Sequence, residues 1–218
     1  MVEIKNNKSN ESERIMAEHI VIRQATTDDV EAILNIYGGY VSDTTISFEV
    51  EVPTVEEFRK RMEQIQTQFP WLVCEIDGVV AGYAYASKHA QRAAYRWSAD
   101  LSVYISEKNH RRHIADALYE ALFTILRAQG YYTVYAGVST PNPKSEAFHL
   151  AKGFTVVGVY PNVGYKLGKW CTLTWYGLVL QEYGEEPQEP ESLKAVLTEG
   201  EIKEILACSA QRVSMTGK

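Results

Sequence analysis

Short apolar runs bounded by turn residues dominate the centre of this chain, and they predict β-strands. Residues 71–76 and 79–87 are two such runs joined by Asp77-Gly78, a dipeptide that is among the strongest signals for a β-hairpin. The remaining runs that predict strands cover residues 19–24, 94–106, 132–138, 154–160 and 172–180.

Polar residues with helix-capping chemistry follow the first predicted strand. Thr27 is placed to cap a helix over residues 28–40, whose first acidic residues suit a positive helix N-terminus. Thr54 and Glu57 fit a capping box that opens a second helix over residues 55–65.

Two more helices are predicted on either side of the run at 132–138. Apolar residues recur at helical spacing over residues 113–129, and Gly130 ends that segment. Asn142 is placed to cap a shorter helix with Pro143 at its first position, and Gly153 ends it. Helices lying between strands predict an α/β protein with a mixed, mostly antiparallel twisted sheet flanked by helices.

The composition changes along the chain and suggests three parts. Residues 1–18 are polar and charged and are predicted to be a disordered extension. Residues 19–181 carry the predicted sheet and form one domain. Residues 182–218 begin with an acidic, proline-containing linker and end in a weak helical pattern, with Thr198 and Glu201 as a capping box. Docking of this tail on the domain or on a partner is open; we expect it to be loosely held.

The overall composition fits a cytoplasmic protein and argues against several classes of function. A formal net charge of −6 argues against general nucleic-acid binding. The three cysteines are far apart, so neither a disulfide framework nor a thiolate zinc site is expected. The N-terminus lacks the apolar segment of a secretory signal, and no apolar run reaches the roughly 20 residues of a membrane span.

Positive charge crowds the predicted start of the third helix, at Lys108, His110, Arg111, Arg112 and His113. Each cation there should cost about 0.3–1 kcal/mol, because a helix N-terminus is itself positive. The arrangement makes sense if an anion binds among them, and free N–H groups at the helix start would complete a diphosphate site. A solvated basic loop is the alternative. Two histidines without a third ligand do not predict a metal site.

Six separated blocks, in the right order, resemble the GNAT acetyltransferase superfamily and, more narrowly, the phosphinothricin and methionine sulfoximine N-acetyltransferases. The blocks are IRQATTDDVEAILNIY, PWLVCEIDGVVAGYAYA, RAAYRWSADLSVYIS, the cationic turn and helix through LYEAL, NPKSEAFHLAKGF and GYKLGKW. The resemblance covers about residues 20–180. It implies a GNAT fold, acetyl-CoA as co-substrate and a homodimer.

The resemblance places a pyrophosphate loop, Gln/Arg-x-x-Gly-x-Gly/Ala, on the cationic turn. It implies coenzyme binding by His110, Arg111, Arg112, His113, Ile114 and Ala115. His113 departs from the family's glycine, which lets the backbone approach the phosphates. If the position needs a positive φ, a non-glycine residue costs about 1–2 kcal/mol. We therefore expect coenzyme binding to be weakened rather than abolished, unless the imidazole donates a hydrogen bond to phosphate; a helix-surface histidine without a role is the remaining alternative.

Asp100 and His149 are the candidate catalytic residues. Asp100 is a carboxylate in an otherwise apolar and aromatic strand, where the resembled subfamily has a glutamate regarded as the base. Because aspartate is one methylene shorter, a relaying water is favoured for deprotonating the amine. His149 stands where the wider superfamily often has a tyrosine acid and the resembled subfamily has a histidine, and a histidine titrates near neutral pH. An outward-facing strand charge and a satisfied helix histidine are the alternatives.

The pantetheine arm is expected to pair with the main chain of the same strand around Val103 and Ile105. Asn142 and Ser145 match the subfamily's Asn-x-x-Ser. They either touch the pantetheine arm or serve only as a helix cap and a first-turn residue.

Three residues are candidates for binding the acceptor. Arg92 and Tyr95, with Trp97, match the subfamily's Arg-x-x-Tyr-x-Trp, in which an arginine can grip a carboxylate or phosphinate; Tyr95 or Phe48 is the candidate wall of the pocket. The alternative is a core aromatic and a solvated arginine. Thr172 replaces an aspartate of the family, which weakens any transfer of fine substrate specificity.

These features together predict an acetyl-CoA-dependent N-acetyltransferase that acts on the primary amine of a small amino acid or analogue by direct attack on the thioester. The expected partners are acetyl-CoA, a small amine and a second copy of the chain, with no nucleic acid, membrane or metal. A degenerate GNAT domain that works as an acyl-CoA-binding or protein-interaction module without catalysis is the rival reading. An enzyme that acetylates peptide or protein amines is the third.

Overall fold

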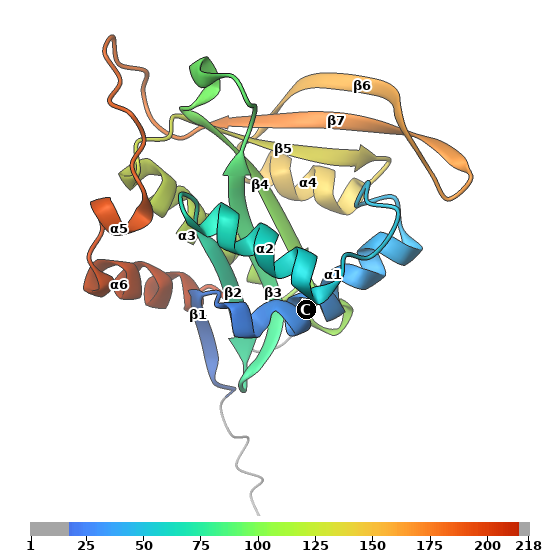
Figure 1. Cartoon of the computed structure of the whole chain (residues 1–218), viewed down its shortest axis with the longest axis horizontal. Helices are drawn as coiled ribbons and strands as arrows, with labels where there is room; N and C mark the ends of the chain where they lie inside the picture. The colour runs from blue at the N-terminus through green and yellow to red at the C-terminus, as the bar shows by residue number, and fades with distance from the viewer. Residues whose placement is uncertain (1–17, 214–218) are drawn as a thin grey trace, which may run out of the picture.

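The computed structural model describes residues 18–213, which form a seven-stranded mixed sheet with helices on both faces (Figure 1). The strands are β1 (Ile20–Gln24), β2 (Trp71–Ile76), β3 (Val79–Lys88), β4 (Ser98–Ile105), β5 (Thr133–Thr140), β6 (Thr155–Lys166) and β7 (Lys169–Val179). Their order is β1-β2-β3-β4-β5-β7-β6, and every neighbouring pair is antiparallel except β4 and β5. The predicted fold class is confirmed.

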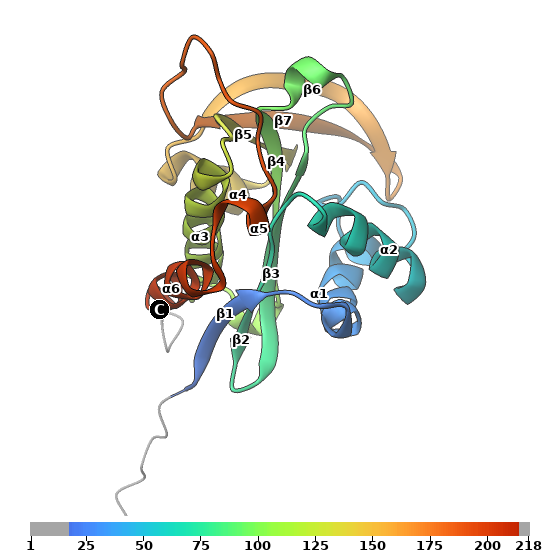
Figure 2. The ribbon, with the colours of Figure 1, turned by 60° about the vertical axis from the view of Figure 1, so that its left-hand side comes forward.

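The helices divide into two layers. They are α1 (Val30–Asp43), α2 (Val55–Gln66), α3 (Ile114–Ala128), α4 (Pro143–Ala151), α5 (Leu193–Val196) and α6 (Glu199–Ala210). Figure 2 shows α1 and α2 on one face of the sheet and α3, α4 and α6 on the other. Two hydrophobic cores result, one under α3 and α6 and one under α1 and α2. No helix among residues 18–213 is long and apolar enough to cross a membrane.

The predicted helix caps are largely confirmed. Thr54 and Glu57 form the capping box of α2, and Asn142 accepts the Ser145 backbone N–H at 3.2 Å at the start of α4. The expectation for Thr27 is wrong by one residue. Thr26 caps the first helical turn, because the Asp29 carboxylate reaches back to accept the Thr26 backbone N–H at 2.7 Å.

The long strand expected over 94–106 is shorter than predicted. Residues Ala93–Tyr95 form a single 3-10 turn, η2, because the Arg92 carbonyl accepts the Tyr95 backbone N–H at 3.0 Å, so the chain turns before β4 begins. The last two strands are longer than predicted. They form a continuous hairpin whose turn, at Leu167 and Gly168, has positive φ at both residues.

The C-terminal extension packs against the domain, which corrects the expectation of a loosely held tail. The Thr198–Glu201 capping box opens α6 as predicted. Ile202 and Leu206 of α6 are buried in the core shared with α3, and α6 also contacts β1. The boundary at residue 181 stays a prediction, and the extension expected over 1–18 lies outside the described residues except for Glu18.

Candidate active site

A cleft opens where β4 and β5 stop pairing. Their parallel register runs only from Ser98–Thr133 to Asp100–Tyr135, after which the two strands diverge. The cleft has about 420 Å³ of empty volume and is walled by residues 101–104 of β4, residues 136–139 of β5, Tyr119, Asn142, Ser145, His149 and Ile46. Ile46 belongs to the connection between α1 and α2, whereas Tyr119 and His149 lie on α3 and α4. The cleft is therefore lined from both faces of the sheet.

Strand β4 lines this cleft, and the pairing of its main chain with the pantetheine arm stays a prediction. Val103 lies in the wall. Ile105 ends the strand, and its carbonyl already accepts the Tyr40 hydroxyl at 2.7 Å. Beyond Asp100 the β5 side of β4 has no register with β5, so its main-chain groups there are available to an extended ligand.

The cationic turn adopts the backbone that an anion site requires. Arg111 and His113 both have positive φ, 62° and 59°, and His113 is the N-cap of α3 with ψ of 17°. The Ala117 N–H bonds to the His113 carbonyl, so the N–H groups of the preceding first-turn residues have no acceptor within the helix. Ile114 and Ala115 can thus offer backbone donors, and the turn fits a diphosphate.

The side chains of the turn are not equally placed to meet phosphate. Arg112 is buried, and its guanidinium donates to Asn109 at 3.1 Å and to the Glu18 carboxylate. The His110 Nε2 lies 3.1 Å from the Ile105 carbonyl and 3.2 Å from the Tyr40 hydroxyl. The Ile114 side chain is in the core under α3.

Arg111 and His113 are exposed at the same turn. They are therefore the two predicted coenzyme-binding side chains with most freedom to meet a ligand. Arg112 and Ile114 instead fix the position of the turn.

Asp100 lies beside the point where the strands diverge, on the face covered by α1 and α2. Its neighbours Ala99 and Leu101 belong to the core under α3, so alternation along β4 puts Asp100 on the opposite face. The carboxylate is 25% exposed and its Oδ1 lies 2.6 Å from the Nδ1 of His89. Burial raises the Asp100 pKa to about 6, although the hydrogen bond and charge of His89 act to lower it.

His89 was missed by the sequence reasoning, although a signal existed. Ser87 pairs with Asp100 in the β3–β4 register, and His89 follows two residues later, just past the end of β3. Residues diagonal across an antiparallel pair are within reach of long side chains. The antiparallel connection of the two runs could therefore have suggested the contact.

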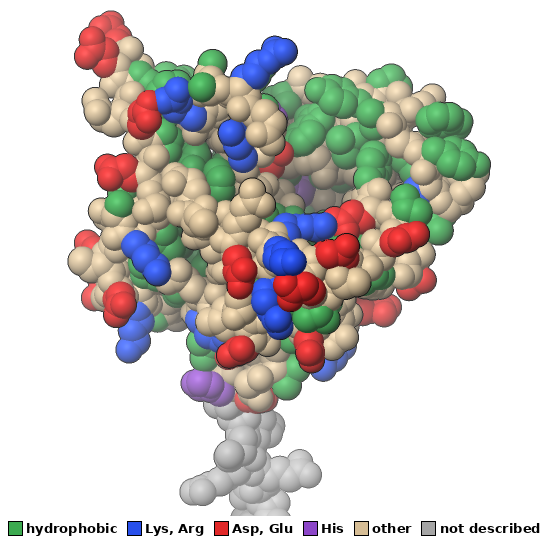
Figure 3. All heavy atoms as spheres, in the orientation of Figure 1, with side chains coloured by type: hydrophobic (Ala, Val, Ile, Leu, Met, Phe, Trp, Pro, Cys, Tyr) green, Lys and Arg blue, Asp and Glu red, His purple; other side chains and the backbone are tan. Residues whose placement is uncertain are grey.

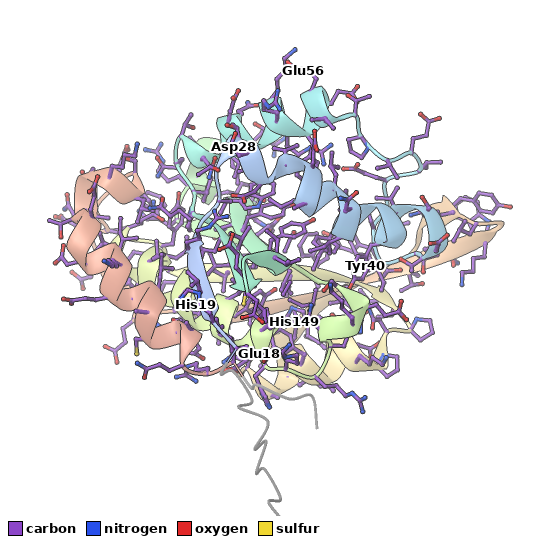
Figure 4. The ribbon with its side chains drawn as sticks, turned by 90° about the horizontal axis from the view of Figure 1, so that it is seen from below. Glu18, His19, Asp28, Tyr40, Glu56 and His149 are labelled. Atoms are coloured by element: carbon purple, nitrogen blue, oxygen red, sulfur yellow. The ribbon has the colours of Figure 1, made fainter. Side chains whose placement is uncertain are left out.

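His149 has both ring nitrogens engaged by protein groups. Its Nδ1 lies 2.8 Å from the Ser145 carbonyl, and its Nε2 lies 3.2 Å from the Tyr119 hydroxyl. A carbonyl only accepts, so Nδ1 carries the proton and Nε2 accepts from Tyr119. Burial lowers the His149 pKa, so the ring is neutral near pH 7, and burial raises the Tyr119 pKa well above its usual value. Figure 4 shows His149 and Tyr40 on opposite sides of the sheet.

The candidate acceptor residues come from two segments of the chain, the α1–α2 connection for Phe48 and the β3–β4 connection for Arg92 and Tyr95. The Tyr95 ring contacts His89 edge-on, with centroids 5.9 Å apart, and is largely exposed. Phe48 packs so closely on Gly164 of β6 that a Cβ there would lie 2.7 Å from its ring. Arg92 is exposed just before η2. Figure 3 shows a hollow in this face of the molecule, bordered on the hairpin side by hydrophobic side chains.

Lys166 is a buried residue of the hairpin that holds the Phe48 loop. Its Nζ donates to the Ser47 carbonyl at 2.7 Å, and burial lowers its pKa. This bond ties the connection between α1 and α2, which carries Phe48 and Ile46, to the end of β6. Among residues 18–213 no group of three or more His, Cys, Asp or Glu side chains is placed to hold a metal ion. The expected absence of a metal stays a prediction.

Comparison with known proteins agrees with this geometry. Residues 22–175 match the family model described as an acetyltransferase (GNAT) domain. The phosphinothricin N-acetyltransferase of Streptomyces viridochromogenes is 35% identical over 81% of this chain and 94% of its own length. The L-methionine sulfoximine/L-methionine sulfone acetyltransferase of Salmonella typhimurium is 30% identical over 75% of this chain and 96% of its own.

A solved structure extends the comparison to the coenzyme. The phosphinothricin acetyltransferase of Sinorhizobium meliloti, crystallised with acetyl-CoA, superposes on this chain with a TM-score of 0.75 at 30% identity. It covers 81% of this chain and 96% of its own. The family match spans most of the chain. The chain therefore belongs to the GNAT acetyltransferase family and is an acetyl-CoA-dependent N-acetyltransferase.

Proposed function

We propose that the acceptor is the primary amine of a small amino acid or analogue, similar to phosphinothricin or methionine sulfoximine. The relatives named for these substrates are 30–35% identical over most of the chain. The observation that carries the proposal is Asp100, a partly buried carboxylate with a pKa of about 6 beside the diverging strands. An ionised carboxylate there can take a proton from an ammonium group near neutral pH.

Asp100 acts as the base in this mechanism. The acceptor amine is mostly protonated at pH 7, since an α-amino group has a pKa of about 8. Its proton passes to Asp100, through a water if the short side chain does not reach. The free amine then attacks the thioester carbonyl of acetyl-CoA, and main-chain N–H groups of β4 polarise that carbonyl. Collapse of the adduct expels the thiolate, and the second proton of the attacking nitrogen passes to that thiolate, which leaves the neutral amide and free coenzyme A.

His149 assists from the other face of the sheet, through Tyr119. The neutral imidazole accepts the hydrogen bond of the Tyr119 hydroxyl and so fixes that hydroxyl in the cleft wall. Because burial raises the Tyr119 pKa, the hydroxyl keeps its proton, which it donates to His149. The cleft wall on this side therefore carries neutral polar groups rather than a buried charge.

The coenzyme and the acceptor enter the cleft from different faces. Val103, Ile105, Asn142 and Ser145 are assigned to the pantetheine arm, and the turn from His110 to Ala115 is assigned to the pyrophosphate, chiefly through backbone N–H groups. On the other face Arg92 is proposed to bind the acceptor's carboxylate, with Tyr95 and Phe48 as walls. The alternation of side chains along β4 supports this division.

A homodimer is part of the proposal. Strand β6 lies at the edge of the sheet and exposes a row of apolar side chains, including Val159, Tyr160 and Val163, each more than half exposed. Hydrophobic side chains gather over the hairpin in Figure 3. A long apolar edge strand favours association, and natural proteins otherwise protect such edges. The cytoplasmic location expected from the sequence stays a prediction.

The test is Asp100→Ala assayed with a panel of amines by release of free thiol. We expect turnover to fall by about 10²–10⁴-fold, the usual contribution of a general base. Acetyl-CoA affinity, measured by calorimetry, should change little, because Asp100 lies on the acceptor side. An unchanged rate would remove Asp100 from the mechanism. Turnover of peptide amines but of no amino acid would overturn the proposed acceptor.

A further inference from the structure

A histidine with no assigned role is the closest ionisable partner of the proposed base. The Nδ1 of His89 lies 2.6 Å from the Asp100 Oδ1, and the two side chains are similarly shielded, 23% and 25% exposed. An ionised carboxylate only accepts hydrogen bonds, so Nδ1 must carry the proton that bridges the pair. A bond this short between an imidazole and a carboxylate is of the charge-assisted kind.

Three aromatic rings hold the imidazole in place. Its ring stacks on Tyr135 of β5, with centroids 4.4 Å apart and planes at 25°. Trp175 of β7 and Tyr95 of η2 contact it edge-on at 5.8 Å and 5.9 Å. The ring is therefore oriented by packing from three elements, and its Nδ1 is directed to Asp100 without needing the hydrogen bond to align it.

Among residues 18–213, the other groups that interact electrostatically with the Asp100 carboxylate are two phenols. Tyr85 of β3 and Tyr135 of β5 interact with Asp100, and both phenols have a raised pKa. Trp175 does not titrate. Among the described residues, His89 supplies the hydrogen bond and the charge interaction that lower the Asp100 pKa. Burial works in the opposite direction, so the ionised form of Asp100 depends on this histidine.

We propose that His89 is a positioning residue for the acetyl transfer: by donating Nδ1–H to Oδ1, it orients the Asp100 carboxylate and keeps it ionised, which leaves Oδ2 to take the proton of the acceptor ammonium. The proposal rests on the proposed role of Asp100 as base. The proton balance is simple, because one proton leaves the ammonium nitrogen and arrives on Oδ2. The His89 proton stays in the hydrogen bond throughout.

Two variants separate the donor from the ring. His89→Phe keeps an aromatic ring for Tyr135 to stack on but has no donor. His89→Asn loses the ring but places a side-chain N–H near the position of Nδ1. The pH dependence of kcat/KM for acetylation of phosphinothricin should be measured for the wild type and both variants. Thermal unfolding and acetyl-CoA calorimetry on each variant report that it is folded.

In the pH profile of kcat/KM, we expect the acid limb of His89→Phe to lie about one pH unit higher than that of the wild type. The reason is that the ionised Asp100 carboxylate loses a hydrogen bond in this variant. Its kcat/KM should then be roughly tenfold below the wild type near pH 5.5 and approach it above pH 8. His89→Asn should restore the acid limb. An acid limb that stays in place in His89→Phe would overturn the proposal, as would an equal loss at every pH in both variants, because that pattern belongs to a packing role.

A second readout keeps this inference separate from the proposed function. The Asp100 pKa can be followed by NMR of ¹³C-aspartate-labelled protein, with the signal assigned by its absence in Asp100→Asn. A higher pKa in His89→Phe than in the wild type and His89→Asn supports the pairing even if the wild type acetylates no amino acid. Equal pKa values in all three proteins overturn it, whatever the enzyme's substrate.

Discussion

Replacing His113 with glycine should make the protein more stable than replacing it with alanine. His113 has a φ of 59° and a ψ of 17°, a left-handed conformation that costs a non-glycine residue about 1–2 kcal/mol. Alanine keeps that strain and glycine removes it. Glycine offsets about 0.5–1 kcal/mol of that gain, because it loses more backbone conformational freedom on folding than alanine does. The glycine variant should therefore have a free energy of unfolding about 0.5–1 kcal/mol above that of the alanine variant.

Thermal and urea unfolding of the two variants measure this difference. A gain of that size corresponds to a Tm about 1–4 °C higher for a domain of this length. Thr124, exposed in the middle of α3, provides the matched control. The backbone at Thr124 is ordinary helix, so Thr124→Gly should be less stable than Thr124→Ala by about 1 kcal/mol. The sign of the glycine–alanine difference should thus be opposite at the two positions.

Acetyl-CoA calorimetry on the same variants separates the two effects of His113 on the coenzyme. If the Cβ obstructs the approach of the phosphates, the glycine variant should bind more tightly than the alanine variant. The difference between the wild type and alanine then reports what the imidazole contributes. An alanine variant that is at least as stable as the glycine variant, and binds at least as tightly, would refute the reasoning about this turn.

Two further predictions test the hairpin and the C-terminal helix. Val159→Lys on β6 should convert dimers to monomers in light-scattering chromatography. Val79→Lys on the β2–β3 hairpin should not, although Val79 is 55% exposed and Val159 is 53% exposed; a wild type that is already monomeric would contradict the expected homodimer. Leu206→Ala should lower the free energy of unfolding by about 2–3 kcal/mol, because Leu206 is buried between α6 and the core under α3. Glu204→Ala, at an exposed position of the same helix, should change that free energy by less than about 0.5 kcal/mol. Equal effects of Leu206→Ala and Glu204→Ala in urea unfolding would show that the tail is not held as the structure has it.

Local chemistry made much of the fold predictable. Asp77 and Gly78 both adopt positive φ in the β2–β3 turn, as the dipeptide predicts, and Thr54 caps α2 through Glu57. These signals depend only on residues a few positions apart. The start of β4 could not be found in the same way, since a β-rich run from residue 94 gives no sign that Arg92 and Tyr95 close a turn first.

The active site was predictable in its positions but not in its partners. Asp100 and His149 stand out in the sequence because a carboxylate and a histidine are unusual in their segments. What they bind depends on the register of β3 with β4 and on the packing of α4 against α3, which bring His89 to Asp100 and Tyr119 to His149. Arg112 shows the same limit, because its burial against Glu18 depends on where β1 begins.

The two departures from the family pattern differ in how the structure accommodates them. The strain at His113 is small beside the burial of α3, where each fully buried leucine contributes about 1.5–3 kcal/mol, so the helix can hold a left-handed residue at its start. No comparable burial of apolar surface stabilises the ionised carboxylate of Asp100. A base must be ionised when the amine arrives, and the same burial that brings Asp100 among aromatic rings favours its neutral form. Only a donor directed at that carboxylate opposes the effect of burial. Because His89 is that donor, Asp100 and His89 should be exchanged together rather than singly in any variant that lengthens the carboxylate at position 100.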